Sequence, residues 1–219
     1  MKRMQRTKRP ALLRAGALGL ALPVLLGVVS CVYQPVPVTS DTTRGGFFTR
    51  HTMRGKQDGL HKTIYRSSYL VHPDVLPAGS PAEILMYSSR WIDLEIDGIS
   101  CRMHFQDTPF AVSDSGIRRF IDKHFVRDRA AIRLEEVSDA NRKLVDRGQA
   151  AIGMTKKEVL LAIGYPSHID STTPTADLPR EKVLESNRWT YRYQRIAFVP
   201  IFWNYQFGTD GKLLVRDPP

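Results

Sequence analysis

The chain has 219 residues and carries 32 basic and 22 acidic side chains, which gives a formal net charge of +10. Six of the basic residues lie before residue 31, so the remainder holds 26 basic and 22 acidic residues, a surplus of four. Because the high positive charge is largely a property of the N-terminal segment, composition gives little support to nucleic-acid binding.

The N-terminal segment begins with positive charge and continues as an apolar run. Six basic residues and no acidic residue occur in the first fourteen positions, and an uncharged run rich in Leu, Val, Ala and Gly follows from Ala15 to Ser30. This order is typical of an export signal. A retained membrane helix is the alternative, but the apolar core is shorter than the ~20 residues that a membrane span needs. We therefore predict a signal peptide over residues 1–30.

The end of this run, Val28-Val29-Ser30-Cys31, resembles the lipobox of bacterial lipoproteins. In that interpretation cleavage follows Ser30, and Cys31 becomes an N-terminus that carries acyl chains such as palmitate. Several acyl chains on one residue anchor a protein stably to a membrane. Val32 follows Cys31 where an inner-membrane lipoprotein has Asp, which is similar to lipoproteins sorted to the outer membrane. The predicted location is therefore the outer membrane, with the folded part facing the periplasm.

Residues 31–59 show no sustained periodicity and contain Pro35, Pro37 and scattered charges. This composition favours a flexible tether between the lipid and a folded body. From residue 60 to residue 108 the pattern changes to β. The expected strands are Thr63–Val71 and Ala82–Tyr87, with a turn at Leu76-Pro77-Ala78-Gly79-Ser80 between them and a hairpin after them.

The hairpin is the clearest β signal. Asp97-Gly98 separates two alternating runs, and Asp-Gly strongly favours a tight hairpin turn. Pairing Ile96 with Ile99 fixes the register and puts Cys101 in the core as an inert apolar residue. The other predicted pairs are Leu94 with Cys101 and Ile92 with Met103 on the apolar face, and Asp93 with Arg102 and Trp91 with His104 on the opposite face. The turn and the hairpin loosely resemble bacterial SH3-like barrels.

Three helices are expected between residues 109 and 166. The first, in a linking segment over residues 109–137, follows Ser113 or Asp114, and the second follows Ser138. The third has the strongest boundaries, because Thr155-x-x-Glu158 is a capping box. Gly164 and then Pro166 end this third helix.

The polar segment Ser167–Asn187 is predicted as a long loop. Three strands follow it, and they carry more large rings than one helical layer can cover. An uncovered apolar face beside Trp and Tyr is typical of a protein-binding patch. The expected strands are Arg188–Gln194, Ile201–Phe207 and Lys212–Val215, and the candidate partner-binding residues are Phe198, Ile201, Phe202 and Trp203.

The same region holds an ordered series of motifs: Ile152-Gly-Met-Thr-x-x-Glu-Val159, Leu161-x-x-Gly164-x-Pro166, Trp189-x-Tyr191 and Phe207-x-x-x-Gly211-x-Leu213. Together with the N-terminal signal, this series resembles the BamE (SmpA/OmlA) family of small outer-membrane assembly lipoproteins, over roughly residues 138–216. The resemblance implies two helices packed on a three-stranded antiparallel sheet. It also implies a scaffold role in outer-membrane assembly or envelope integrity. The family's typical member is shorter and has no preceding β module, so a paralogue with another partner is an alternative.

No catalytic or metal-binding pattern stands out. The six histidines include no i, i+4 pair on a helix, and the chain has neither a GxSxG motif nor a phosphate-cradling glycine loop. We therefore expect a protein that is not an enzyme, with no cofactor, no metal and no nucleic-acid partner. A hydrolase whose Ser, His and acid meet only in the folded chain is an alternative. His124, near a helix C-terminus, is expected to be structural.

These patterns together predict an α+β fold. It consists of a small β-barrel-like (SH3-like) module and then two helices packed on a three-stranded antiparallel sheet, as in BamE. The predicted segments are a signal peptide (1–30), a tether (31–59), an SH3-like β module (60–108), a linking helix and loop (109–137) and a BamE-like domain (138–219). The predicted function is a scaffold or binding module, held at the membrane through Cys31 and contacting an envelope protein. The alternatives are binding of peptidoglycan or a peptide by the SH3-like module, and inhibition of a secreted enzyme.

Overall fold

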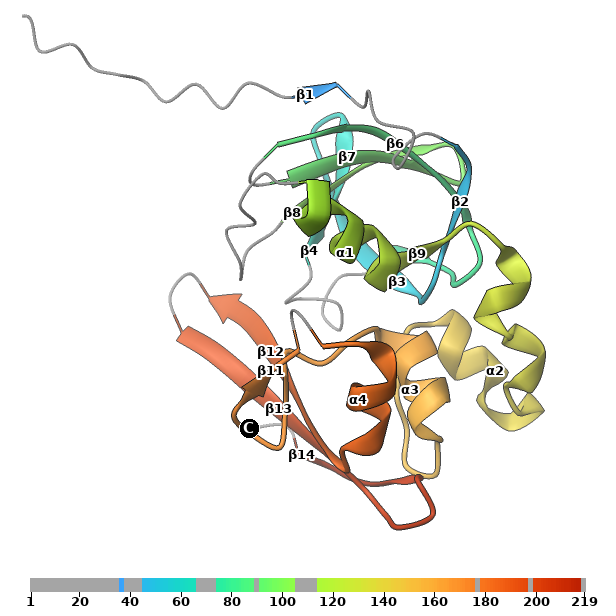
Figure 1. The fold of residues 1–219 in the computed structure, drawn as a ribbon, viewed down its shortest axis with the longest axis vertical. Coiled ribbons are helices and arrows are strands. Elements are labelled where there is room, and N and C mark those ends of the chain that lie inside the picture. Colours follow the sequence, from blue (N-terminus) through green and yellow to red (C-terminus); the bar gives the residue numbers. More distant parts are fainter. Residues whose placement is uncertain are drawn as a thin grey trace, which may run out of the picture. The chain divides into compact units, whose positions relative to one another are not determined.

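The computed structural model describes residues 36–37, 45–65, 74–88, 91–104, 114–175, 178–196 and 199–217. In this part the chain forms two β-sheets and four α-helices (Figure 1). Both sheets belong to one compact unit that extends from Tyr33 to Pro219. None of the described helices has the length and apolar character needed to cross a membrane.

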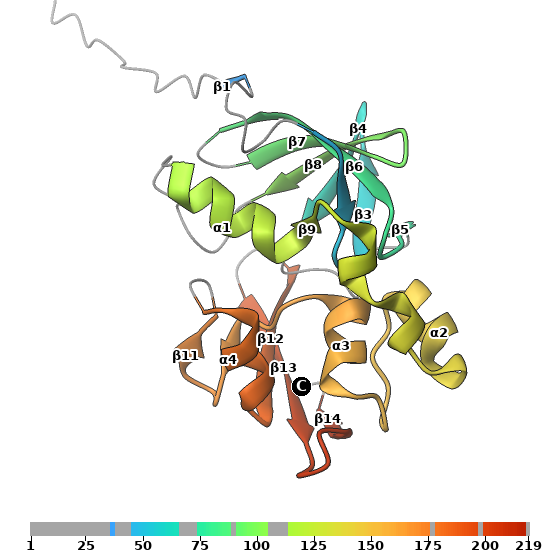
Figure 2. The same cartoon turned by 45° about the vertical axis from the view of Figure 1, so that its right-hand side comes forward.

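The N-terminal sheet has the strand order β5-β3-β4-β8-β7-β6-β2-β9, and β1 pairs with β6. The pairing of β4 with β8 is parallel. Figures 1 and 2 show that the sheet curls into half of a barrel and that α1 (Asp114–His124) lies along its inner side. The strands are β1 (Val36–Pro37), β2 (Phe47–Thr49), β3 (Met53–Asp58), β4 (His61–Tyr65), β5 (Asp74–Leu76), β6 (Pro81–Tyr87), β7 (Trp91–Ile96), β8 (Ile99–His104) and β9 (Phe125–Val126).

The apolar stripe of α1 explains why the sheet curls around this helix. Ile117, Phe120 and Ile121 are spaced to share one helix face, and all three are buried. They belong to the same core cluster as Ile92 and Leu94 of β7, which are fully buried. Because a sheet with one apolar face must be covered, α1 supplies the second layer of this core.

The hairpin of β7 and β8 has the predicted register. Ile96 pairs with Ile99, and Leu94 pairs with Cys101. Asp97 and Gly98 both have positive φ, 53° and 75°, as the tight turn requires. Cys101 is completely buried, and burial raises the pKa of its thiol to about 11. The thiol therefore stays protonated at neutral pH, which agrees with an inert core residue.

The C-terminal sheet has the strand order β11-β10-β12-β13-β14 and is antiparallel throughout. Helices α3 and α4 contribute Leu160 and Val183 to the core cluster that contains Trp189 and Tyr205 of the sheet. The remaining elements are η1 (Arg129–Ile132), η2 (Leu134–Glu136), α2 (Asp139–Asp146), α3 (Lys156–Ile163), β10 (His168–Ile169), β11 (Thr173–Pro174), α4 (Arg180–Glu185), β12 (Arg188–Ile196), β13 (Val199–Phe207) and β14 (Leu213–Asp217).

The capping box of α3 is confirmed. Glu158 donates its backbone N–H to Thr155 Oγ1 at 3.2 Å, and Glu158 Oε2 accepts from the backbone N–H of Thr155 at 2.8 Å. The helix ends at Gly164, whose φ of 74° suits glycine. Ser138 precedes α2 as predicted, but its hydroxyl does not cap that helix. It donates instead to Glu158 Oε1 at 2.9 Å, so this carboxylate ties α2 to α3.

The predicted fold class is wrong. The described part is mostly β, with two sheets and a few short helices. It is not an SH3-like module followed by a BamE-like layer of two helices on a three-stranded sheet. The N-terminal sheet also takes strands from outside residues 60–108, and the C-terminal sheet has two further short strands. In the N-terminal sheet, β2 and β9 are added by pairing between segments far apart in sequence, which local patterns do not report. In the C-terminal sheet, the further strands β10 and β11 have only two residues each, too few to give a periodic signal.

Two segments that were predicted to be irregular contain regular structure. Residues 45–59, within the predicted tether, form β2 and β3, and Phe47 and Met53 of these strands are buried. The predicted loop Ser167–Asn187 contains β10, β11 and α4. Val183 is the buried residue of α4. Very short elements of this kind give almost no periodic signal.

Candidate binding cleft around Arg50

The residues that the sequence singled out do not form one surface. Ser30, Cys31 and Phe198 lie outside the residues that the structure describes. Ile201 and Trp203 are half-buried and pack against the core of the C-terminal sheet. Phe202 is 42% exposed and lies on the opposite face, because side chains alternate along a strand.

The nearest neighbours of Phe202 on its face of the sheet are polar. Phe202 pairs with Arg192, and the next pair on that face is Thr190 with Asn204, joined by a side-chain hydrogen bond of 3.0 Å. Trp203 lines a cavity of about 340 Å³, and its ring centroid lies 5.3 Å from the guanidinium carbon of Arg216. The described part of this sheet therefore presents Phe202 among polar partners.

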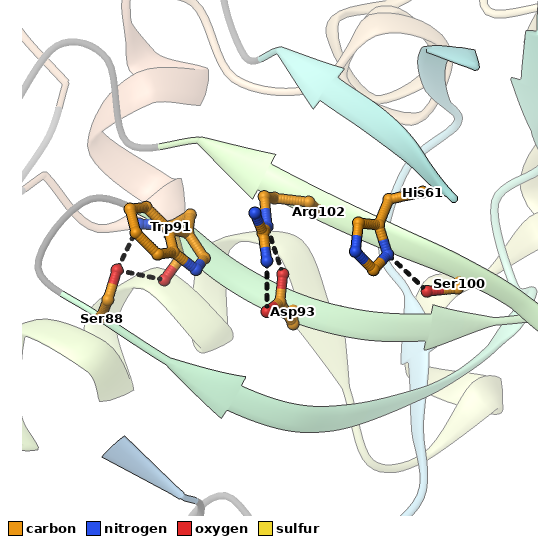
Figure 3. Close-up of polar contacts among 6 residues, drawn as sticks. All are labelled: His61, Ser88, Trp91, Asp93, Ser100 and Arg102. Carbon is orange, nitrogen blue, oxygen red and sulfur yellow. Dashed lines mark hydrogen bonds and ion pairs between the residues drawn. The ribbon is translucent and has the colours of Figure 1, made fainter. Parts of the chain in front are cut away.

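A row of polar side chains crosses the outer face of the N-terminal sheet (Figure 3). Arg102 donates from Nε and Nη2 to the two carboxylate oxygens of Asp93, at 2.6 and 2.9 Å. The same guanidinium lies 5.0 Å from the ring centroid of Trp91. Farther along the row, the Nδ1 atom of His61 lies 2.9 Å from the hydroxyl of Ser100.

Asp93 and Arg102, in the middle of this row, neutralise each other through two hydrogen bonds. The pairing of Asp93 with Arg102 is confirmed, and its two-bond geometry suits a carboxylate that is only 8% exposed. Next to it, burial lowers the pKa of His104, and the charge of Arg102 lowers it further. The row therefore holds β7 and β8 together and does not present an unmatched charge at Asp93 or Arg102.

A pair of buried histidines lies next to Arg50. His51 Nε2 is 2.8 Å from His124 Nδ1, and His51 Nδ1 is 3.1 Å from the carbonyl oxygen of Thr52. Because a carbonyl can only accept, neutral His51 carries its proton on Nδ1, and His124 donates to its Nε2. The backbone N–H of Thr52 donates to the carbonyl of Leu161 in α3 at 2.8 Å. This joint holds the β2–β3 connection against α1 and α3.

The backbone of Arg50 is hydrogen-bonded to the histidine pair, and its side chain lines three neighbouring cavities. Its backbone N–H donates to the carbonyl of His124 at 2.8 Å. The side chain is half-buried, and its Nε is buried with no hydrogen-bond partner among the residues that the structure describes. Burial is the largest influence on the pKa of the guanidinium and lowers it. Arg180 also lowers this pKa, and the opposing influences of Tyr165, Asp122 and Glu181 are too small to reverse the shift. The Nε atom has therefore lost water without gaining an acceptor among the described residues.

Three cavities share Arg50, with volumes of about 610, 450 and 380 Å³. The largest runs from η1 and η2 to the start of α3, and the second runs along α1 and β9. The smallest lies between α1, Tyr165 and the start of α4. The largest and the smallest also share Arg180 and Glu181. We call the three together the Arg50 cleft; each has the size of a ligand site.

The smallest cavity has the clearest charge imbalance. Four basic and two acidic side chains line it: Arg50, Arg119, Lys123 and Arg180, with Asp122 and Glu181. Lys123 is held in place, because its Nζ donates to the carbonyl of Thr175 and lies 5.8 Å from the ring centroid of Tyr165. Within the described part of the chain, no hydrogen bond or ion pair holds the guanidinium of Arg180.

Most charges that line the largest cavity are already matched. Glu136 forms ion pairs with Arg133 at 2.7 Å and with Lys157 at 3.2 Å. Glu158 accepts hydrogen bonds from Ser138 and Asn141 in addition to its capping bond. Burial would raise the pKa of Glu158, but these hydrogen bonds outweigh burial and hold its pKa below the ordinary value. Unmatched positive charge is therefore concentrated at Arg50 and Arg180.

The chemistry that this arrangement suits is anion binding. Guanidinium groups carry forked donors that fit the oxygens of a carboxylate or a phosphate. Among the described residues, no group of three or more His, Cys, Asp or Glu side chains is placed to hold a metal ion.

The sequence did not indicate Arg50 as a site residue, because Arg50 lies within the predicted tether. Its neighbours Arg119, Lys123 and Arg180 lie on two helices far along the chain, and no motif connects them to Arg50. The one available signal was the basic polar side of the helix that follows Ser113. A charged face is usually solvated, so this signal alone did not indicate a site.

Comparisons of the chain with protein-family models, with curated proteins and with solved structures gave no match. The chemistry of the candidate site and the N-terminal sequence are therefore the features that indicate a function.

Proposed function

We propose that this protein is a lipid-anchored protein of the bacterial cell envelope that works by binding a ligand or partner in the Arg50 cleft. The charged and apolar N-terminal segment that ends at Cys31 supports the anchor. The observation that carries the binding function is the half-buried guanidinium of Arg50, which lines three cavities and whose Nε lacks a partner among the described residues.

Stability alone does not account for this arrangement. Burying a charge is unfavourable unless hydrogen bonds replace its lost water. Other buried charges of this chain, Glu158 and the Asp93–Arg102 pair, are matched by hydrogen bonds. Local violations of such matching tend to occur at functional sites. A bound anion would supply the acceptors that Arg50 lacks.

The proposed setting is the outer membrane, with the cleft facing the periplasm. There the protein acts as a binding module in envelope assembly or integrity, and an envelope protein is its partner. Binding to peptidoglycan and inhibition of a secreted enzyme are the alternatives that the experiment distinguishes.

The test is a crosslinking pull-down from the membrane fraction with wild type, Cys31→Ala, Arg50→Gln and Arg188→Gln. Arg188 is an exposed arginine outside the Arg50 cleft, so its variant is the matched control. We expect Cys31→Ala to leave the membrane fraction. Arg50→Gln should stay in the membrane but lose its partners, and Arg188→Gln should behave as wild type.

Each arm has an outcome that contradicts one part of the proposal. If Cys31→Ala stays in the membrane, the lipid anchor is wrong. If Arg50→Gln captures the same partners as wild type, the cleft is not the binding site. Recovery of muropeptides would identify the cell wall as the ligand, and recovery of a secreted hydrolase would favour the inhibitor alternative.

A further inference from the structure

We infer that the Arg50 cleft recognises a phosphate monoester, with Arg50 and Arg180 as the side chains that bind the phosphate and Lys123 as a fixed cation beside them. This inference rests on the proposed function, because it names the chemistry that the same cleft takes.

The charge of the smallest cavity favours phosphate over a carboxylate. Its four basic and two acidic side chains leave a formal excess of two positive charges. A phosphate monoester carries a charge of about −1.5 to −2 at pH 7, whereas a carboxylate carries −1. A single carboxylate would leave part of the excess unmatched inside a partly buried site.

The geometry supplies donors from three directions. Arg50 comes from the β2–β3 connection, Lys123 from α1 and Arg180 from the start of α4, and all three line the same cavity. Two guanidinium groups that are not engaged elsewhere among the described residues can each direct two N–H bonds at phosphate oxygens. Lys123 is positioned by its bond to Thr175 and contributes charge without moving.

The adjoining cavity provides room for the organic part of the ester. The cavity of about 450 Å³ also contains Arg50, and its lining includes the apolar side chains of Phe47, Ile121 and Phe125. A phosphate held at Arg50 and Arg180 would therefore have an apolar wall beside it. The ester can come from a lipid headgroup or from a soluble metabolite, and both present the same phosphate chemistry.

The test is thermal unfolding of the full protein, extracted from membranes in a neutral detergent, at constant ionic strength. The probes are inorganic phosphate, glycerol 3-phosphate, a short-chain phosphatidic acid and acetate. We expect the phosphate probes to raise Tm in a saturable way and acetate to have no effect. Arg50→Gln and Arg180→Gln should each weaken phosphate binding about tenfold or more, because each removes charge-assisted hydrogen bonds. Arg188→Gln should bind as wild type.

A second readout separates binding from folding. Without a probe, Arg50→Gln should unfold at the Tm of wild type or above it, since a poorly matched buried charge has been removed. Protection by acetate equal to that by phosphate would overturn the inference, and so would phosphate protection that survives in both arginine variants. Protection by phosphatidic acid far beyond that by glycerol 3-phosphate would support the site and identify a lipid headgroup as the source.

The two proposals fail in different ways. If Arg50→Gln loses its crosslinked partners while no phosphate probe protects the wild type, the phosphate chemistry is wrong and the binding function stands. If phosphate protects the wild type through Arg50 while partner capture is unaffected, the phosphate site stands and the proposed partner-binding role is wrong.

Discussion

Glu158, which is buried, and Arg50, which is half-buried, both line the largest cavity of the Arg50 cleft, but their charges are matched to different extents. Glu158, at the start of α3, receives hydrogen bonds from three residues and is 5% exposed. Arg50, beside the histidine joint, has a buried Nε with no acceptor in the described part of the chain. The first charge joins α2 to α3, and the second stays available. The contrast shows that residues lining this cavity supply hydrogen-bond partners to one charged side chain, Glu158, and not to the Nε atom of the other, Arg50.

The largest expected effect comes from removing the matched charge. Glu158→Ala should lower the free energy of unfolding by about 3 kcal/mol, because it removes a helix cap and the charge-assisted hydrogen bonds by which the buried carboxylate joins α2 to α3. Denaturant unfolding measures this change. Glu185→Ala is the control, since Glu185 forms an exposed ion pair with Lys182. If Glu158→Ala loses no more stability than the control, the hydrogen bonds of Glu158 do not stabilise the fold as proposed.

The next effect concerns the His51–His124 pair next to Arg50. A Cβ at Gly164 would lie 2.8 Å from Cε1 of the buried His51 ring, and its φ is +74°. Gly164→Ala should therefore lower the free energy of unfolding by about 2 kcal/mol. Gly211 has a similar φ of +75° and open space around it, so Gly211→Ala should lose only about 1 kcal/mol. Equal losses measured for the two variants would show that the His51 ring can shift to accommodate the new Cβ at little cost.

The pH dependence of stability tests whether the hydrogen bonds of Glu158 stabilise its charged form. The pKa of Glu158 is lower in the folded state, so its contribution is present above the pKa of an unfolded Glu, about 4.3. That contribution is lost as the pH falls further, through the folded-state pKa. Unfolding measured from pH 7 to pH 3 should therefore show a smaller acid-induced loss in Glu158→Gln than in wild type. Parallel curves for the two proteins would contradict the pKa shift.

The smallest expected effect is that of Arg50→Gln on the ligand-free protein. Removing a guanidinium that burial has desolvated should change the free energy of unfolding by no more than about 0.5 kcal/mol or should increase it. The measurement is denaturant unfolding beside Arg188→Gln. A loss as large as that of Glu158→Ala would mean that Arg50 is structural, and the comparison between the two charges would fail.

The features that the sequence predicted correctly are local. The Asp97-Gly98 turn fixes its own hairpin register, and the Thr155–Glu158 box spans one helical turn, so neighbouring residues contain the whole signal. The fold class failed because β2 and β9 join the N-terminal sheet through distant pairing. The cleft depends on Arg50, Lys123 and Arg180, which come together only in the folded chain. Arg50 also lies within the predicted tether, a segment in which no binding residue is expected.

The strand order of the N-terminal sheet has a consequence for how the chain folds. The β7–β8 hairpin closes over a two-residue turn, which is a fast step. By contrast, β2 must find β9 across nearly the whole of the sheet's sequence, and the parallel β4–β8 pair must also close a long loop before it forms. A chain that emerges N-terminus first therefore keeps Phe47 and the outer edge of β2 uncovered until α1 and β9 are synthesised. An exposed apolar ring beside an unpaired strand edge favours aggregation, so this interval is the aggregation-prone stage of folding, and hairpin β7–β8 is the part that can form first.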